Sequence, residues 1–154
     1  MVSKIEYYQK LYDKAVEVAT EAHEGQTRWG GEPYITHPLA VSDAFSLKDN
    51  PREKIAAVLH DVLEDSDTTS QDLMKTFPVE IVEALVILTH AQEEAYADYI
   101  MRIRGDTRFP RLENLIAIEV KLADLDHNLS DLDHPKKHKQ RRDKYQLARK
   151  LLTL

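Results

Sequence analysis

The sequence predicts an all-α fold, a helical bundle formed as one domain over residues 1–154. Apolar residues recur at three- and four-residue intervals through most of the chain, and no segment alternates apolar and polar residues over the length of a convincing strand. Only four of the 154 residues are glycine, so few positions interrupt a helix. A chain of this length can bury a full hydrophobic core.

The N-terminal segment predicts a long helix that ends near Gly25. Its inward-facing residues keep a helical spacing: Ile5, Tyr8, Leu11, Ala15, Ala19 and Ala22. A glycine just after them suits a helix C-terminus. Residues 26–36 contain adjacent glycines and a proline, so we expect an irregular loop or one short β-hairpin there. This loop delivers His37 to the start of the next helix, where Pro38 fits the first turn.

Residues 52–63 predict a helix, with apolar residues at Ile55, Ala56, Leu59 and Leu63. If the helix continues, His60 stacks on Glu64, and Asp61 stacks on Asp65 in the same way. Like charges at this spacing repel by about 0.2–0.5 kcal/mol per pair, and carboxylates at a helix C-terminus face the negative end of the helix dipole. A bound cation removes both conflicts. The run therefore predicts a metal site, with a solvated acidic helix end as the alternative.

Three further helices follow. Thr69 is placed to cap a short helix through Phe77, and Pro78 opens another. Residues 93–104 predict a surface helix, and residues 105–110 a turn. The inward-facing residues expected on these helices are Ile81, Leu85, Val86, Leu88, Tyr96, Tyr99 and Ile100.

Residues 111–132 predict a second long helix with one continuous buried stripe. The residues of the stripe are Leu115, Ile118, Leu122, Leu125, Leu129 and Leu132. A polar row of Lys121, Asp124, Asn128 and Asp131 flanks it. Such a row is usually a solvated helix flank, so its function depends on the motifs around it.

The C-terminal segment is basic. Residues 134–154 carry eight lysines or arginines against the single acid Asp143, a net charge of +7. Because the whole chain carries −6, residues 1–133 carry −13. An acidic body of this kind repels duplex phosphates, so we expect no nucleic-acid partner and favour contact with a small polyanion. The alternative is a solvated terminal helix that packs through Tyr145, Leu147, Ala148, Leu151 and Leu152.

Composition limits the setting and the ligands. No run of about 18 apolar residues and no secretory N-terminal pattern occurs, so we expect a cytoplasmic protein with no membrane partner. The chain has no cysteine, which excludes disulfides and thiolate metal sites. Imidazole, carboxylate, carbonyl and water oxygen are then the available metal ligands.

Five motifs stand in order along the chain, at residues 22–28, 31–38, 59–65, 120–124 and 127–128. Together they resemble the hydrolase domain of the bifunctional Rel/Spo alarmone enzymes and the stand-alone small alarmone hydrolases of the HD superfamily. Each motif is weak alone, but the five in this order cover nearly the whole chain. The resemblance implies an HD-domain helical bundle.

The resemblance also implies a reaction. Four residues match the family's ligands for one divalent ion, usually Mn²⁺: His37, His60, Asp61 and Asp124. Glu64 and Asp65 match its catalytic pair, which would orient and deprotonate a metal-polarised water. The implied activity is hydrolysis of the 3′-pyrophosphate of (p)ppGpp to GDP or GTP and pyrophosphate. Two imidazoles with two carboxylates suit Mn, Fe, Co or Zn, so the donor set alone leaves the metal open.

Five residues match substrate contacts. Arg28 resembles an arginine that stacks on the purine, as its flat guanidinium allows. Asn128 matches a residue near the sugar, and Arg141 with Tyr145 resembles a pair that reaches the phosphates or sugar. Lys121 either contacts the substrate or supports the site through an ion pair.

Departures from the family pattern leave the substrate open. Trp29 stands where a small or basic residue is common, and residues 125–126 replace an arginine. The indole either stacks on the base or plugs the loop. Two other functions stay open: an HD phosphohydrolase acting on (p)ppApp, NADPH or another nucleotide, and a non-catalytic module that binds an alarmone or restrains a synthetase. Retention of Glu64 and Asp65 favours the enzyme, and a homodimer is compatible with the sequence.

Overall fold

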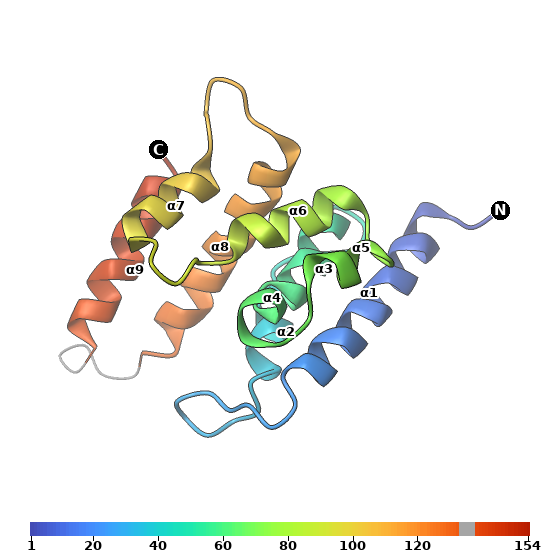
Figure 1. Cartoon of the computed structure of the whole chain (residues 1–154), viewed down its shortest axis with the longest axis horizontal. Coiled ribbons are helices and arrows are strands. Elements are labelled where there is room, and N and C mark those ends of the chain that lie inside the picture. The colour runs from blue at the N-terminus through green and yellow to red at the C-terminus, as the bar shows by residue number, and fades with distance from the viewer. Residues whose placement is uncertain (133–137) are drawn as a thin grey trace.

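Helices make up most of the chain, and turns and loops join them (Figure 1). The computed structural model describes residues 1–132 and 138–154. Its helices are α1 (Lys4–Ala22), α2 (Thr36–Ser42), α3 (Pro51–Leu59), α4 (Val62–Asp65), α5 (Ser70–Met74), α6 (Val79–Leu88), α7 (Tyr96–Arg104), α8 (Leu112–Ser130) and α9 (Lys139–Leu152). These two described ranges contain no sheet, and the hairpin expected at residues 26–36 is reduced to one isolated bridge between Thr27 and Pro33. The all-α class is confirmed.

Local signals set several helix ends where the sequence predicts them. Gly25 follows α1 with a φ of 78°, the left-handed conformation that glycine adopts without strain. Thr69 caps α5, and its side chain accepts from the backbone of Asp72 in a reciprocal capping box. Two boundaries differ from prediction: α5 ends at Met74, before Phe77, and α7 begins at Tyr96, after residue 93.

The prediction of one helix over residues 52–63 is wrong, because the chain breaks between α3 and α4. The ring Nδ1 of His60 donates to the carbonyl oxygen of Ala57 at 2.6 Å, and that oxygen would otherwise serve the next turn. The break turns His60 and Asp61 toward the same point. The side chains of His60 and Asp61 therefore meet directly, with His60 Nε2 3.1 Å from Asp61 Oδ2. Asp61 also keeps the predicted proximity to Asp65, since their carboxylate oxygens lie within 4.8 Å.

Helix α3 lies at the centre of the core, in contact with α1, α2, α6 and α8 (Figure 1). Its five residues from Ile55 to Leu59 are fully buried, since helices cover it on several sides. Helix α8 packs against α6 and α3 on one flank and α9 on another. This arrangement carries a polar residue, Asp124, into the interior.

Four residues expected to face inward are exposed, and one of them is Ile5 on α1, at 53%. Leu115 is 47% exposed, because the deeply buried face of α8 is formed by Ile116, Ala117, Val120 and Leu125. The stripe predicted for residues 111–132 is therefore only partly buried. Val86 on α6 and Leu147 on α9 are exposed as well, at 48% and 58%. Apolar spacing locates a helix more reliably than it orients one when neighbours cover more than one face.

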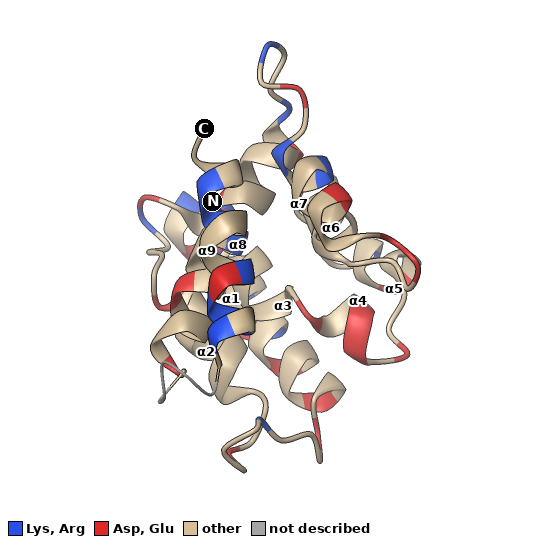
Figure 2. Ribbon diagram, turned by 90° about the vertical axis from the view of Figure 1, so that its left-hand side faces the viewer, with Lys and Arg blue, Asp and Glu red and all other residues tan. Residues whose placement is uncertain are grey.

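Helix α4 carries the acidic residues Glu64 and Asp65, and its ribbon is coloured red close to the break after α3 (Figure 2). Helix α9 packs on α7 and α8, so the described part of the basic segment lies against the rest of the protein. Residues 134–137 of that segment lie outside the described residues. Among the helices that the structure describes, none combines the length and apolar character needed to cross a membrane.

Candidate metal centre and active site

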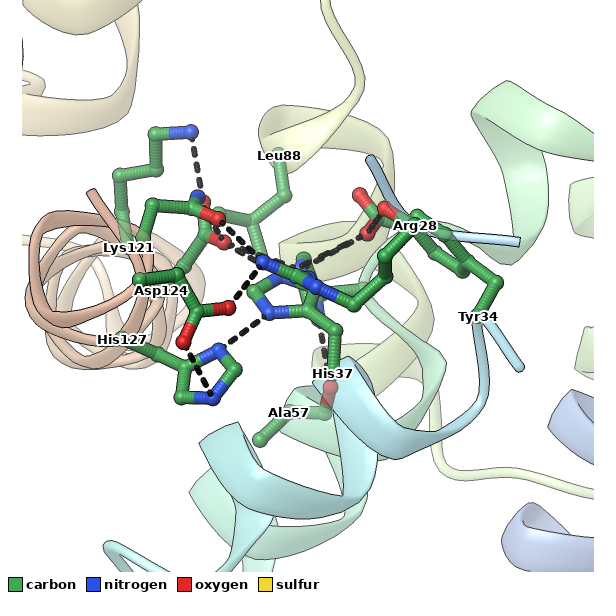
Figure 3. Close-up of polar contacts among 12 residues, drawn as sticks. Arg28, Tyr34, His37, Ala57, Leu88, Lys121, Asp124 and His127 are labelled. Atoms are coloured by element: carbon green, nitrogen blue, oxygen red, sulfur yellow. Dashed lines mark hydrogen bonds and ion pairs between the residues drawn. The ribbon is translucent and has the colours of Figure 1, made fainter. Parts of the chain in front are cut away.

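Four polar side chains from three separate elements meet in the interior (Figure 3). His37 comes from the first turn of α2, His60 and Asp61 from the break after α3, and Asp124 from the middle of α8. His37, His60 and Asp124 are at most 5% exposed. Burial of so many polar groups costs free energy unless each finds a partner.

The donor atoms of these four residues converge on one small volume. His37 Nε2 lies 2.8 Å from Asp124 Oδ1 and 3.9 Å from Asp61 Oδ2. His60 Nε2 lies 3.1 Å from Asp61 Oδ2 and 3.4 Å from Asp124 Oδ1. Ligand atoms about 2.1 Å from one octahedral ion lie about 3 Å apart when adjacent, so these separations fit donors around a single cation.

In its neutral form, the ring of His60 presents an unprotonated nitrogen to this volume. Its Nδ1 donates to the Ala57 carbonyl, which leaves Nε2 with the lone pair in the neutral tautomer. Nε2 is buried and makes no hydrogen bond of acceptable geometry to the described residues, although two carboxylates are near. A divalent cation satisfies such a nitrogen and both carboxylates at once, so the residues fit a metal ion.

The charges of the cluster perturb its titration. Burial opposes a charged His60 ring, but Asp61 and Asp124 outweigh it and hold the pKa of His60 well above its ordinary value. Burial likewise opposes the Asp61 carboxylate, yet His60 lowers the pKa of Asp61 to about 2. Burial, together with the charge of His60, lowers the pKa of His37 despite the Asp124 carboxylate beside it. The cluster therefore holds a proton that a metal would have to displace.

His127 supports the site from behind His37, and its role was missed from the sequence. The two Nδ1 atoms lie 2.7 Å apart, and the rings stack with centroids 4.9 Å apart. If Nε2 of His37 offers its lone pair to a metal, its Nδ1–H must donate to His127. His127 Nε2 in turn faces Asp131 Oδ1 at 4.0 Å. The sequence feature that could have predicted this role is the position of His127 between Asp124 and Asp131 on one helix.

Tyr34 is a second supporting residue that received no role from the sequence. Its hydroxyl donates to Asp61 Oδ2 at 2.5 Å, and its ring contacts the edge of His37. Burial and the Asp61 charge raise the pKa of the Tyr34 phenol, so the hydroxyl keeps its proton and stays a donor. The loop before α2 thus orients one candidate ligand while delivering another.

Asp124 is held by two side chains of its own helix. Lys121 Nζ donates to Oδ2 at 2.9 Å, and Asn128 Nδ2 donates to Oδ1 at 3.0 Å. Burial opposes the Lys121 ammonium, but Asp124 outweighs it and raises the pKa of Lys121 well above its usual range. The ion pair predicted as one role for Lys121 is present.

Glu64 and Asp65 lie beside this cluster on α4. Oxygen atoms of Asp61, Glu64 and Asp65 approach within 4.8 Å of one another. Glu64 Oε1 accepts from the backbone of His90 at 2.7 Å, which fixes one of its two oxygens. Partial burial and the charges of Asp61 and Glu64 raise the pKa of Asp65 to about 6. Asp65 can therefore take up a proton close to neutral pH.

A cavity of about 300 Å³ opens beside the cluster and brings in the loop and α9. Its lining residues are Thr27, Arg28, Trp29, Tyr34, His37, Asp61, Lys121, Asp124, Asn128 and Tyr145. Arg28 donates to Asp131 Oδ2 at 2.7 Å and to Asn128 Oδ1 at 3.4 Å. The guanidinium carbons of Arg28 and Arg141 lie 5.0 and 4.8 Å from the Trp29 ring centroid. The structure thus brings the predicted substrate residues to one side of the cluster.

The chain is similar in sequence to a family of known proteins. The family model described as HD domain matches residues 15–152. The bifunctional (p)ppGpp synthase/hydrolase SpoT of Escherichia coli K12 is 38% identical over 157 residues, which cover 94% of this chain and 21% of that protein. A guanosine-3′,5′-bis(diphosphate) 3′-pyrophosphohydrolase of Borreliella burgdorferi is 33% identical, covering 90% of this chain and 21% of that protein.

A solved structure shares the fold. It belongs to a metazoan orthologue of SpoT that hydrolyses ppGpp, with a TM-score of 0.72 and 25% sequence identity over 92% of this chain and 83% of that one. The chain spans about a fifth of the length of the curated relatives named above.

Proposed function

Because the chain belongs to the HD domain family, we propose that it hydrolyses the 3′-pyrophosphate of (p)ppGpp to GDP or GTP and pyrophosphate. One observation carries the proposal: two imidazole nitrogens and two carboxylates converge between an acidic pair and a cavity lined by Arg28 and Trp29. The names of the similar proteins and the solved structure of a ppGpp hydrolase support it.

The cofactor we propose is one Mn²⁺, held by His37, His60, Asp61 and Asp124. Such an ion lowers the pKa of a water and neutralises charge on the phosphoryl oxygens. The other residues keep its donors aligned. Tyr34 orients Asp61, while Lys121 and Asn128 each hold one oxygen of Asp124.

Glu64 and Asp65 would handle the proton of the attacking water. A bond forms between the water oxygen and the 3′-phosphorus, and the bond from that phosphorus to the sugar 3′-oxygen breaks. The water proton passes to the acidic pair, whose oxygens lie within 4.8 Å of the candidate ligand Asp61. The acidic pair then returns that proton to the leaving 3′-oxygen, which departs as the free hydroxyl, so no covalent intermediate with the protein is needed.

Arg28 and Trp29 would hold the nucleoside on the cavity side of the cluster, with Arg141 and Tyr145 reaching from α9. The Trp29 ring is 55% exposed at this wall, so a flat surface is available to a base. An indole accepts any base by stacking. This favours a second candidate substrate of the same site, an adenine nucleotide such as (p)ppApp or NADPH.

The test is pyrophosphate release by the metal-stripped protein with and without Mn²⁺, with ppGpp, ppApp and NADPH in parallel. We expect Mn²⁺-dependent release of pyrophosphate from ppGpp. Turnover of only ppApp or NADPH would keep the site and replace the substrate. No turnover of any of them would replace the enzyme by a binding module.

A further inference from the structure

A second cavity, of about 160 Å³, adjoins the cluster without Arg28 or Trp29 in its wall. Its lining residues are His60, Asp61, Glu64, Leu88, His90, Tyr96, Tyr99, Lys121, Asn128, Lys144 and Tyr145. It shares four lining residues with the larger cavity: Asp61, Lys121, Asn128 and Tyr145. One substrate can therefore extend from the larger cavity, past the candidate metal ligands, into the smaller one.

The wall of this smaller cavity offers cationic and phenolic donors. Lys144 Nζ lies 4.1 Å from the ring centroid of Tyr96, and Lys121 Nζ lies 5.3 Å from that of Tyr99. Lys121 is paired with Asp124, whereas Lys144 makes no ion pair with the described residues. The Tyr96 hydroxyl is buried and finds no hydrogen-bond partner among the same residues. An ammonium and a buried phenol thus both lack an acceptor here.

The charges that act most on Lys144 are those of two other cations. Partial burial, followed by the charges of Lys121 and Arg141, lowers the pKa of Lys144. An anion between these groups would relieve their repulsion. Two acids share this wall. Asp61 is a candidate metal ligand that a bound cation would neutralise, and Glu64 accepts from the His90 backbone through one oxygen. The cavity therefore favours an anion over a neutral ligand.

Its size limits that anion. The volume equals that of about five water molecules, and sites for drug-sized ligands usually have about 300–1,000 Å³. A whole nucleotide does not fit, but a pyrophosphate does. In the proposed reaction the nucleoside occupies the larger cavity, so the terminal phosphate of the 3′-pyrophosphate points away from it.

We propose that the smaller cavity is the site of the departing pyrophosphate, with Lys144 as its main charged contact and the Tyr96 hydroxyl as a hydrogen-bond donor. The assignment rests on the proposed function for the identity of the product, and on the cavity wall for the anion. It also assigns a selectivity: the site recognises a diphosphate on the 3′ side, since a 3′-monophosphate does not reach Lys144.

The experiment measures pyrophosphate binding by calorimetry, using full-length protein loaded with one equivalent of Mn²⁺ and freed of excess metal. GDP is titrated in parallel as the other product. The variants are Lys144→Met, Lys144→Arg and Tyr96→Phe, and Lys150→Met is the matched control because it removes one exposed charge from the same helix outside the cavity. Thermal unfolding checks that each variant is folded.

We expect Lys144→Met to weaken pyrophosphate binding about tenfold, as for loss of one charge-assisted hydrogen bond, with GDP binding unchanged. Tyr96→Phe should weaken pyrophosphate binding by a smaller factor, and Lys144→Arg should retain the affinity of the wild type. Unchanged pyrophosphate binding in Lys144→Met overturns the inference. So does an equal loss in Lys150→Met, because that loss would reflect only the general field of α9.

Turnover of ppGpp by the wild type separates this inference from the proposed function. If the wild type hydrolyses no ppGpp, the proposed function fails. The anion site still stands if pyrophosphate binding depends on Lys144. If ppGpp is hydrolysed and Lys144→Met lowers kcat/KM for it as much as for the analogue with a 3′-monophosphate, the diphosphate selectivity is wrong.

Discussion

Replacement of His127 by phenylalanine should weaken metal binding about tenfold. The phenyl ring keeps the stacking on His37 but removes the nitrogen that lies 2.7 Å from His37 Nδ1. In the metal-free protein His37 can move its proton to Nε2 and donate to Asp124 Oδ1, 2.8 Å away. In the metal-loaded protein Nε2 must ligate, so Nδ1 carries the proton and has no acceptor. The cost therefore falls on the metal-bound state.

The size of the effect follows from that unpaired donor. A buried donor without an acceptor costs about 1–3 kcal/mol, equivalent to about 5- to 150-fold in affinity. The His127 side chain is 25% exposed, so water can replace part of the lost bond and the lower half of the range is expected. Loss of an outer-shell partner usually costs about 10- to 100-fold in metal affinity, which agrees.

The assay is Mn²⁺ affinity by competition with a chelator at fixed pH. His127→Asn is the matched variant, because its side-chain oxygen can accept from His37 where Nδ1 of His127 did. We expect His127→Asn to retain most of the affinity that His127→Phe loses. Affinity of His127→Phe within twofold of the wild type, at unchanged thermal stability, would refute the role of His127.

Four other outcomes are expected. Asp124→Ala should abolish Mn²⁺ binding and turnover together, measured by calorimetry and pyrophosphate release. Glu64→Gln should keep the metal and lower kcat by about 10²- to 10⁴-fold, the usual contribution of a general base. Because the pKa of His60 is raised in the metal-free protein, a metal must displace its proton, so Mn²⁺ affinity should rise with pH through neutrality. Calorimetry in buffers of different ionisation enthalpy measures the released proton, and a pH-independent affinity would contradict this expectation. Trp29→Ala should raise KM for ppGpp about tenfold with little change in kcat, since base stacking is worth about 1–3 kcal/mol.

Helical periodicity predicted the fold class because the apolar spacing of each helix is local information. The break after α3 could not be predicted, since it depends on one bond from the His60 ring to the Ala57 carbonyl. The exposed position of Leu115 depends on how α6, α3 and α9 surround α8, which spacing alone does not encode.

The candidate ligands were predicted from motifs, and the structure brings all four together. The residues that orient these ligands were not predicted, because a contact between side chains from separate elements leaves no pattern in the sequence. The roles of His127 and Tyr34 depend on how α2, α8 and the loop of residues 26–35 pack together. Lys144 was likewise one of several basic residues on α9 until Tyr96 was found beside it.

The central claim is that a metal-dependent water attacks the 3′-phosphorus of an alarmone. Its most direct test is turnover of ppGpp by the Mn²⁺-loaded protein in oxygen-18-labelled water, followed by mass spectrometry of both products. The account predicts label in the pyrophosphate, none in the 3′-hydroxyl of GDP, and no reaction after metal removal. Absence of turnover, or label in the GDP hydroxyl, would contradict it.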